Sequence, residues 1–116
     1  MDNCLFCKIA RAEIPAHKVY EDDAVVAFHD INPVRPLHLL VIPKKHIASL
    51  ASIDDTDTPV LGRMLAIADR LARENGSPEG FRVIINTGRI GMQEVQHLHA
   101  HLIGGPEPVG PMLNRN

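Results

Sequence analysis

The sequence is poor in aromatic residues and has little excess charge of either sign. Its 116 residues include no tryptophan, and aromatic residues make up 3% of the chain. The formal net charge at pH 7 is −2, so no broad basic surface is available for a nucleic-acid backbone. So few aromatic rings also argue against a platform on which bases stack. Nucleic acid is therefore not an expected partner.

Long apolar segments are missing as well. No run approaches the roughly 18 residues that a membrane span needs, and Met1 to Cys4 lack the basic and apolar regions of a signal peptide. We therefore expect a cytoplasmic protein with no membrane partner. In that compartment Cys4 and Cys7, the two cysteines, would be thiols or metal ligands rather than a disulfide. A chain of this length is expected to form a single domain over residues 1–116.

Several enzyme signatures are absent, but one histidine cluster stands out. There is no Gly-x-Ser-x-Gly elbow, no phosphate-binding loop and no Gly-x-Gly-x-x-Gly. His97, His99 and His101 instead alternate with Leu98 and Ala100, a pattern typical of a half-buried strand. The imidazoles would share one face, roughly 6.6 to 7 Å apart at the backbone, close enough to meet one phosphate or one metal ion. A polar strand face without chemistry is the alternative, which three strictly alternating histidines disfavour.

The remaining pattern predicts an α+β fold: an antiparallel sheet with one long helix and a short N-terminal helix. The long helix would be capped by Thr58, with Pro59 at its first position, and would stop at Asn75 and Gly76. Apolar residues at helical spacing between these limits predict its core face. The short helix is expected over residues 4–12, and strands over residues 19–20, 24–28, 38–42, 81–86 and 96–103.

Cys4 and Cys7 form a second chemical signal, because two thiolates at this spacing suit one tetrahedral Zn²⁺. A structural zinc ion needs two more ligands, for which His46 and His97 are candidates. Two plain thiols explain the spacing equally well. A redox pair is a further alternative, although no thioredoxin-like pattern surrounds the two cysteines.

Histidine itself is the best candidate nucleophile in this chain. Covalent catalysis by an imidazole divides one difficult displacement into two easier ones. One ring nitrogen of His99 could attack phosphorus while a backbone carbonyl holds the other nitrogen and fixes the tautomer. The flanking imidazoles, His97 and His101, could then contact phosphate oxygens or bind a metal.

These residues resemble the signature of the histidine triad family, and the resemblance extends over nearly the whole chain. The match to the triad itself is His-Leu-His-Ala-His-Leu-Ile over residues 97–103, and the Gly104-Gly105 tail resembles the nucleotide-binding, bacterial Hint-like branch. Further matching segments, in chain order, are Phe6-Cys7-Lys8-Ile9, Glu13-Ile14-Pro15, Val19-Tyr20-Glu21-Asp22-Asp23, Phe28-His29-Asp30-Ile31-Asn32-Pro33, His38-Leu39-Leu40-Val41-Ile42-Pro43-Lys44-Lys45-His46, Ile85-Asn86-Thr87-Gly88, Gln93-Glu94-Val95-Gln96 and Gly110-Pro111-Met112-Leu113.

The resemblance implies hydrolysis of purine nucleoside phosphoramidates or acyl-nucleotides through a covalent nucleotidyl-histidine. His99 matches the nucleophile, His101 a phosphate contact and His38 a residue that supports the triad. The remaining matches are nucleotide contacts: Asp30 for the ribose hydroxyls, Ile31 beside the nucleoside, Asn86, and the loop of Met92, Gln93 and Glu94.

The resemblance also implies an assembly and a metal. A homodimer would form through the long helix and the strand over residues 81–86. Some bacterial members bind structural zinc through two cysteines and two histidines, which Cys4, Cys7, His46 and His97 match. That assignment would make the triad unequal, with His97 structural, His99 nucleophilic and His101 near phosphate.

Four departures from the family pattern bear on specificity rather than on reaction class. Met92 replaces a frequent glycine, Glu94 stands where some relatives carry serine, and Leu37 and Gln96 also differ. Three other functions remain alternatives: a dinucleoside polyphosphate hydrolase, a hydrolase with catalytic zinc on the three histidines, and a nucleotide-binding module without activity. His17 and His29 match nothing catalytic and are interpreted as surface or loop residues.

Overall fold

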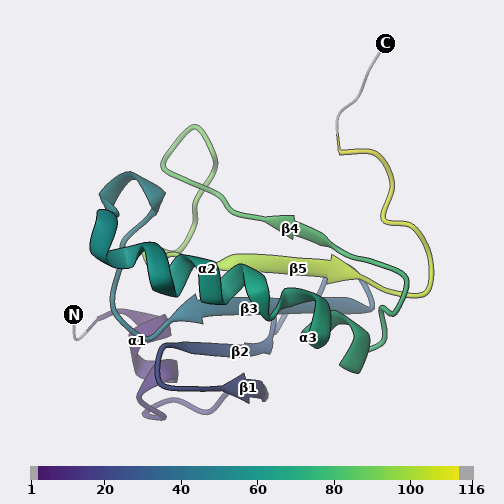
Figure 1. Cartoon of the computed structure of the whole chain (residues 1–116), viewed down its shortest axis with the longest axis horizontal. Coiled ribbons are helices and arrows are strands. Elements are labelled where there is room, and N and C mark those ends of the chain that lie inside the picture. Colours follow the sequence, from purple (N-terminus) through teal and green to yellow (C-terminus); the bar gives the residue numbers. More distant parts are fainter. Residues whose placement is uncertain (1–2, 113–116) are drawn as a thin grey trace.

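The computed structural model describes residues 3–112. Its centre is a five-stranded antiparallel sheet in the order β1-β2-β3-β5-β4 (Figure 1). The strands are β1 (Lys18–Glu21), β2 (Val25–His29), β3 (Leu37–Pro43), β4 (Arg82–Ile84) and β5 (Ala100–Gly104). The helices are α1 (Leu5–Ala10), α2 (Thr58–Ala66) and α3 (Ala68–Glu74), with 3-10 turns at Leu50–Ser52 and Asp55–Asp57. The predicted α+β fold with an antiparallel sheet is confirmed.

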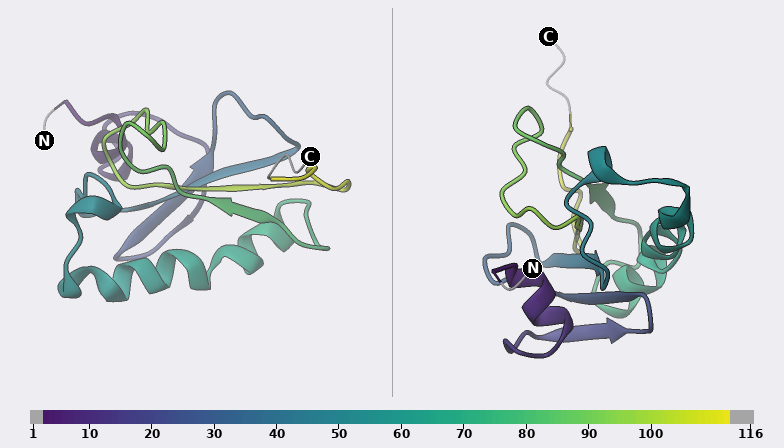
Figure 2. Two further views of the ribbon diagram at one scale, coloured as in Figure 1. Left: turned by 90° about the horizontal axis from the view of Figure 1, so that it is seen from above. Right: turned by 90° about the vertical axis from the view of Figure 1, so that its left-hand side faces the viewer.

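The sheet is covered on both faces, and the two sides have different roles. Figure 2 shows α2 and α3 along one side and α1 on the other. Every residue of β3 is buried, so successive side chains of this strand contribute to opposite sides. The side below α2 and α3 holds the larger core, which includes Val25, Ala27, Leu39, Val41, Met64 and Leu71. The α1 side holds Phe6, Ile9, Val26, Phe28, Leu40 and Ile42.

The histidine segment differs from the prediction in where its strand begins. β5 starts at Ala100, so His97 and His99 lie ahead of the strand. Here the Leu98 N–H donates to the Ile47 carbonyl at 2.7 Å, a bond to the segment that follows β3 rather than to a neighbouring strand. The predicted alternation is nevertheless confirmed, because Leu98 and Ala100 lie in the larger core with Leu102.

The predicted long helix consists of two helices in succession. Ile67 separates α2 from α3 with φ −87° and ψ −7°, and its N–H reaches the Arg63 carbonyl only at 3.3 Å. The Leu71 N–H still bonds to the Ile67 carbonyl at 3.1 Å, so the two helices follow one another closely. The predicted cap is wrong, because Thr58 is already helical and Asp57 precedes it without a capping side-chain bond.

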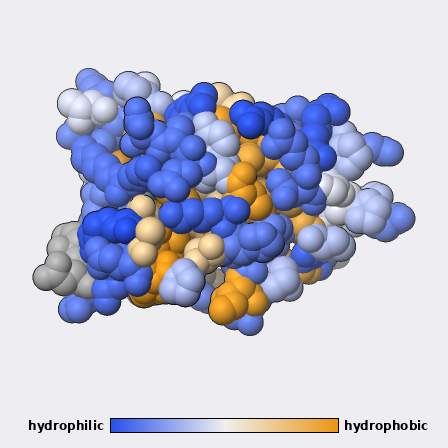
Figure 3. Space-filling view, turned by 90° about the horizontal axis from the view of Figure 1, so that it is seen from below, coloured by the Kyte–Doolittle hydropathy of each residue, from blue (hydrophilic) through white to orange (hydrophobic). Residues whose placement is uncertain are grey.

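β4 forms one edge of the sheet and is shorter than predicted. β4 covers only three residues of the predicted 81–86, because Asn86 already takes part in the following loop through a bond to the Gly91 carbonyl. On the face below β1 the surface is mainly hydrophilic, with small separate hydrophobic areas (Figure 3). Within residues 3–112, no helix has the length and apolar character needed to cross a membrane.

Candidate active site and metal-binding cluster

A cavity of about 370 Å³ lies on the α1 side of the sheet. It brings together histidines from the triad, an amide, two carboxylates and several apolar side chains. The residues that line it are Phe6, Asp30, Leu40, Asn86, Met92, Glu94, Val95, His99 and His101. None of these residues is a lysine or an arginine, so the cavity suits a ligand with little negative charge.

His99 is held in one tautomer by the backbone. Its Nδ1 lies 2.7 Å from the His97 carbonyl, and a carbonyl can only accept, so Nδ1 carries the proton. In the neutral ring the second nitrogen, Nε2, therefore carries a free lone pair and no proton. The ring is 6% exposed, and the Phe6 ring packs edge-on against it with centroids 5.2 Å apart. His99 is thus an oriented imidazole with a free nucleophilic nitrogen.

His38 and His101 form a second chain of hydrogen bonds with a defined direction. The Val34 N–H donates to Nδ1 of His38 at 3.1 Å, so the proton of a neutral His38 must lie on Nε2. That Nε2–H faces Nδ1 of His101 at 2.9 Å, which accepts it. A neutral His101 therefore carries its own proton on Nε2, where it can serve as a donor.

Burial keeps both of these imidazoles neutral. It lowers the pKa of His38 below the ordinary value, although the nearby Asp30 carboxylate opposes this. Burial also lowers the pKa of His101 to about 4, and the neighbouring His99 and His38 contribute in the same direction. At neutral pH the direction of the hydrogen-bond chain is therefore fixed.

Asp30 lines the cavity, and Ile31 follows it in the chain. The Asp30 carboxylate accepts the Asn32 N–H at 2.8 Å through one oxygen, and the other lies 3.4 Å from Nε2 of His38. Ile31 is 91% exposed and does not line the cavity itself. The structure thus places the carboxylate in the cavity and the isoleucine outside it.

Asn86 and Gln93 shape the loop that precedes β5. The Asn86 amide donates to the Gly91 carbonyl at 2.7 Å. Gln93 accepts the Gly88 N–H at 3.0 Å and donates to the Ala48 carbonyl at 2.7 Å. Asn86 still lines the cavity, whereas Gln93 does not. Gln93 therefore acts on the site through the loop that it braces.

The backbone amides of this loop are only partly free. The Met92 N–H donates to the Arg89 carbonyl at 3.1 Å, and the Gln93 N–H donates to the Gly88 carbonyl at 3.0 Å. Of the three residues predicted to touch phosphate, Glu94 is the one whose N–H is left for a ligand within the described part of the chain. Its carboxylate side chain is exposed at the cavity.

Phe6, Leu40 and Val95 line the cavity but were not predicted as site residues. The strand period provides a signal for Leu40, which shares a face of β3 with His38. Phe6 and Val95 reach the cavity from α1 and from the segment before β5. No local pattern indicates how these segments fold onto the sheet.

Four predicted metal ligands gather beside the cavity. The ligand atoms of Cys4, Cys7, His46 and His97 all lie within 4.8 Å of one another. Nδ1 of His97 is 3.3 Å from the Cys4 thiol and 3.5 Å from the Cys7 thiol, and Nδ1 of His46 is 3.3 Å from Cys7. Two thiols and two imidazoles are a donor set that suits tetrahedral zinc.

The orientation of His97 strengthens this fit. Its Nε2 donates to the Pro43 carbonyl at 2.8 Å, which leaves the lone pair of Nδ1 directed at the thiols. A carbonyl that fixes the tautomer in this way is typical of metal-bound histidine. The ring is fully buried. The residues present therefore fit a structural zinc ion, and Nδ1 of His97 faces the two thiols.

A second cluster of possible ligands does not fit a metal. Asp30, His38 and His101 also have ligand atoms within 4.8 Å of one another. However, the Val34 N–H occupies Nδ1 of His38, so the nitrogen that faces His101 carries a proton and has no free lone pair. To bind a metal through Nε2, His38 would have to carry its proton on Nδ1, where it would face the Val34 N–H donor. Hydrogen bonding explains this cluster.

The three triad histidines do not converge on one ion. His97 directs Nδ1 to the thiols, while Nδ1 of His99 donates to a carbonyl and His101 bonds to His38. Among the described residues, the two groups of possible metal ligands each contain only one triad member and exclude His99. This geometry disfavours a catalytic zinc ion held by all three.

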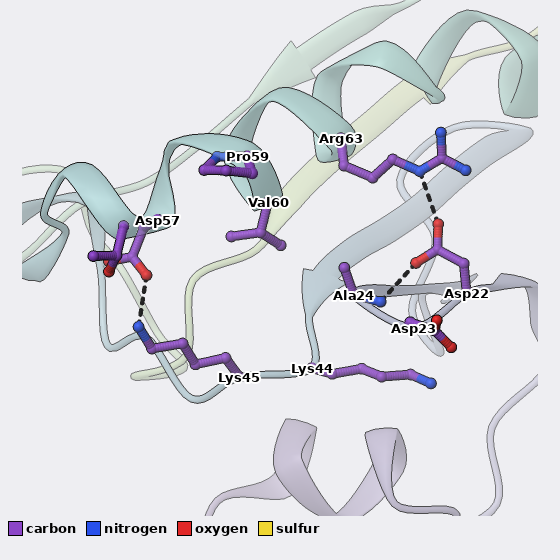
Figure 4. Close-up of a pocket in the computed structure, with 10 residues that line it drawn as sticks. Asp22, Asp23, Ala24, Lys44, Lys45, Asp57, Pro59, Val60 and Arg63 are labelled. Carbon is purple, nitrogen blue, oxygen red and sulfur yellow. Dashed lines mark hydrogen bonds and ion pairs between the residues drawn. The ribbon is translucent and has the colours of Figure 1, made fainter.

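A larger cavity of about 580 Å³ lies elsewhere, between the β1–β2 turn, the residues after β3 and the start of α2. Figure 4 shows ion pairs among its charged side chains, between Lys45 and Asp57 and between Arg63 and Asp22. Lys45 binds Asp57 at 2.7 Å and Arg63 binds Asp22 at 2.8 Å. These pairs satisfy each other and link the elements around the cavity, and the histidines lie outside it.

The fold and the site together define a class of α+β proteins in which imidazoles, rather than a glycine-rich phosphate loop, face a small cavity on an antiparallel sheet. A family model described as HIT domain matches residues 11–107. The chain therefore belongs to the HIT family, as its resemblance to the histidine triad signature predicted.

Known relatives are similar over almost the entire chain. Protein HitA of Neisseria gonorrhoeae is 54% identical over 106 residues, 91% of this chain and 99% of that protein. A purine nucleoside phosphoramidase of Escherichia coli (strain K12) is 46% identical over 113 residues, 97% of this chain and 94% of that protein. A crystal structure of a HIT family hydrolase from Legionella pneumophila Philadelphia 1 is 50% identical, with a TM-score of 0.86 over 90% of this chain and 95% of that chain.

Proposed function

We propose that this HIT protein is a hydrolase and nucleotidyl transferase that acts on purine nucleoside phosphoramidates or acyl-nucleotides and releases the nucleoside monophosphate. The observation that carries the proposal is the bond from Nδ1–H of His99 to the His97 carbonyl, which leaves a lone pair on Nε2 at the cavity. The similarity to a purine nucleoside phosphoramidase over 97% of the chain supports the substrate class.

The reaction divides into two displacements at phosphorus. Nε2 of His99 attacks, the bond from phosphorus to the leaving group breaks, and the leaving group departs with that electron pair and a proton from solvent. Water then adds to the nucleotidyl-histidine and gives up a proton to solvent, the bond from phosphorus to His99 breaks with its electron pair returning to Nε2, and the nucleoside monophosphate leaves. Nε2–H of His101 donates to a phosphoryl oxygen and stabilises the charge that develops there.

The other predicted residues position the nucleotide. The Asp30 carboxylate accepts the ribose hydroxyls, and exposed Ile31 lies against the nucleoside. The Glu94 N–H donates to the phosphate, Asn86 and Met92 contact the ligand from the cavity wall, and Gln93 acts through the loop that it braces. His38 is a positioning residue because its Nε2–H sets the tautomer of His101.

The charge of the cavity favours this substrate class over dinucleoside polyphosphates. Asp30 and Glu94 line the cavity, and none of its lining residues is a lysine or an arginine. Additional phosphate groups would meet carboxylates with no compensating cation. A single phosphate flanked by a nucleoside and an amine or acyl group fits this charge distribution better.

We further propose that Cys4, Cys7, His46 and His97 bind one zinc ion. Bound there, zinc would supply a structural cross-link between α1 and the segment before β5, apart from the reacting atoms. The donor set and the orientation of His97 support this assignment.

Two features favour a homodimer. β4 ends the sheet and offers unpaired backbone groups along its outer edge. On α2, Leu65 is 54% exposed and follows the half-buried Leu61 by one helical turn. A two-fold axis beside β4 would cover both the strand edge and this stripe of α2.

The single domain over residues 1–116 and the cytoplasmic location stay predictions, which limited proteolysis and cell fractionation would test.

Intact-mass analysis of a quenched reaction tests the covalent step. The protein is mixed with an adenosine phosphoramidate of tryptamine, and we expect an AMP adduct that peptide mapping places on His99. His99→Ala should bind AMP but show neither adduct nor turnover. The matched control is His17→Ala, because His17 is exposed and lies outside the cavity, and this variant should keep both the adduct and turnover. An adduct on another residue, or turnover by His99→Ala, would refute the mechanism. AMP binding by the wild type without turnover would favour a binding module.

A further inference from the structure

Met92 adopts a backbone conformation that its residue type disfavours. It has φ +60°, in the left-handed region, and the other described non-glycine residue with positive φ is Ala12 at +59°. In this region the β-carbon crowds the backbone, which glycine avoids. A glycine at position 92 would form the same loop with less strain.

The loop imposes this conformation. Bonds from the Met92 and Gln93 N–H groups to the Arg89 and Gly88 carbonyls close it at two successive positions. The preceding residue is equally constrained, since a β-carbon on Gly91 would lie 2.5 Å from the Thr87 carbonyl oxygen. The chain therefore has glycine where the loop has no space, and methionine where the loop is strained but open.

The Met92 side chain does little for the fold itself. It is 77% exposed, so it buries little apolar surface in return for the strain. It nevertheless lines the catalytic cavity, together with the apolar side chains of Phe6, Leu40 and Val95. A strained, exposed apolar residue at a cavity is typical of a side chain retained for a ligand.

The position of Met92 in the cavity indicates which part of a ligand it meets. Asp30 enters the cavity from the end of β2, and Met92 enters from the loop before β5. Figure 2 shows the loop after β2 and the loop before β5 on the α1 side of the sheet. A nucleoside on Asp30 with its phosphate at His99 would direct the leaving group toward Met92.

We propose that Met92 is a specificity-determining residue that selects leaving groups with an apolar body, such as alkyl or aryl amines. This inference rests on the proposed phosphoramidase function. The flexible, polarisable thioether can adapt to different apolar shapes. Glu94, exposed on the same loop, disfavours an anionic leaving group and tolerates a neutral or cationic amine.

The test compares kcat/KM for two substrates, the tryptamine phosphoramidate of adenosine and the unsubstituted phosphoramidate. One apolar contact is worth on the order of tenfold in specificity, so Met92→Gly should lower the ratio of the tryptamine to the unsubstituted value about tenfold. Ala12→Gly relieves the same backbone strain outside the cavity and should leave the ratio unchanged. Because both variants relieve backbone strain, neither should have a melting temperature below that of the wild type.

The outcomes separate this inference from the function beneath it. An unchanged ratio in Met92→Gly, or an equal change in Ala12→Gly, overturns the role of Met92 while turnover by the wild type upholds the function. Failure of the wild type to hydrolyse either substrate overturns both. A lower ratio in Met92→Gly alone, with an unchanged or higher melting temperature, supports the role in specificity.

Discussion

At the scale of single residues, the three histidines of the motif differ because their neighbours differ. His97 donates a hydrogen bond from Nε2–H to the Pro43 carbonyl and directs Nδ1 at the two thiols. Its backbone carbonyl also orients His99. Nδ1 of His101 accepts a hydrogen bond from Nε2–H of His38. His97 therefore contributes both to the candidate metal-binding cluster and to the orientation of His99, a double part that three equivalent side chains on a strand would not have.

The partly buried imidazole of His101 makes the free energy of unfolding depend on pH. Its pKa is lowered from 6.5 to about 4 by burial and by its histidine neighbours, while the unfolded chain restores the ordinary value. Between these two values the unfolded state binds more protons, so the free energy of unfolding falls as the pH decreases. The contribution of His101 is complete above pH 6.5 and is lost as the pH falls to about 4.

We predict that His101→Asn reduces this loss of stability between pH 7 and pH 4. Each pKa unit corresponds to about 1.4 kcal/mol, and solvent screening at a partly exposed ring leaves on the order of 1 kcal/mol. Urea denaturation at several pH values measures the difference. Between pH 8 and pH 7 wild type and variant should have the same slope, which serves as the control. An equal loss in both proteins below pH 6.5 would contradict the prediction.

At the scale of elements, α1 connects the candidate metal-binding cluster with the cavity that His99 lines. It begins after Cys4 and contains Cys7 and Phe6. The Phe6 ring packs on both His97 and His99, with centroids 5.9 and 5.2 Å away. A helix of six residues is too short to be stable alone, so its position depends on these contacts and on the thiols.

We predict that the purified protein holds one zinc ion per chain and that its removal destabilises α1. Native mass spectrometry measures the stoichiometry, and Cys7→Ser should abolish binding while His17→Ala retains it. Loss of the cross-link should lower the melting temperature by on the order of 10 °C. The zinc-free protein should keep measurable turnover below that temperature. Complete, reversible loss of turnover with an intact fold would instead indicate a catalytic metal.

Elements with a strong local pattern could be predicted from the sequence, and long-range contacts account for the rest. The alternation around Leu98 and Ala100 correctly indicated which side chains enter the core. The same pattern overstated the strand, because the Leu98 N–H bonds to Ile47, a contact far away in sequence. The break at Ile67 and the position of Phe6 likewise depend on packing that the local sequence does not contain.

The candidate site shows the same division. The family signature correctly indicated that Asp30, Asn86, His99 and His101 meet at one cavity. It did not indicate that Val34 sets the direction of the His38–His101 hydrogen-bond chain, because a backbone N–H has no sequence signature. It also did not reveal that the unusual methionine at position 92 lies in the left-handed region.

At the scale of the whole molecule, each side of the sheet has its own task. The α1 side carries the cavity and the metal cluster, and the α2–α3 side contains most of the core. The edge at β1 is linked to α2 through the bond of Arg63 to Asp22, whereas β4 forms the opposite edge. An assembly through β4 and α2 would therefore leave the cavity side of the sheet open.

We predict a homodimer at micromolar concentration, measured by sedimentation velocity. Leu65→Glu places a charge on the exposed stripe of α2 and should shift the protein to monomers, because burying an unpaired carboxylate in an interface is unfavourable. Leu50→Glu, at a position 37% exposed on a 3-10 turn, is the matched control and should stay dimeric. Circular dichroism checks that both variants remain folded. A monomeric wild type would refute the assembly, and a Leu65→Glu dimer as stable as the wild type would exclude α2 from its interface.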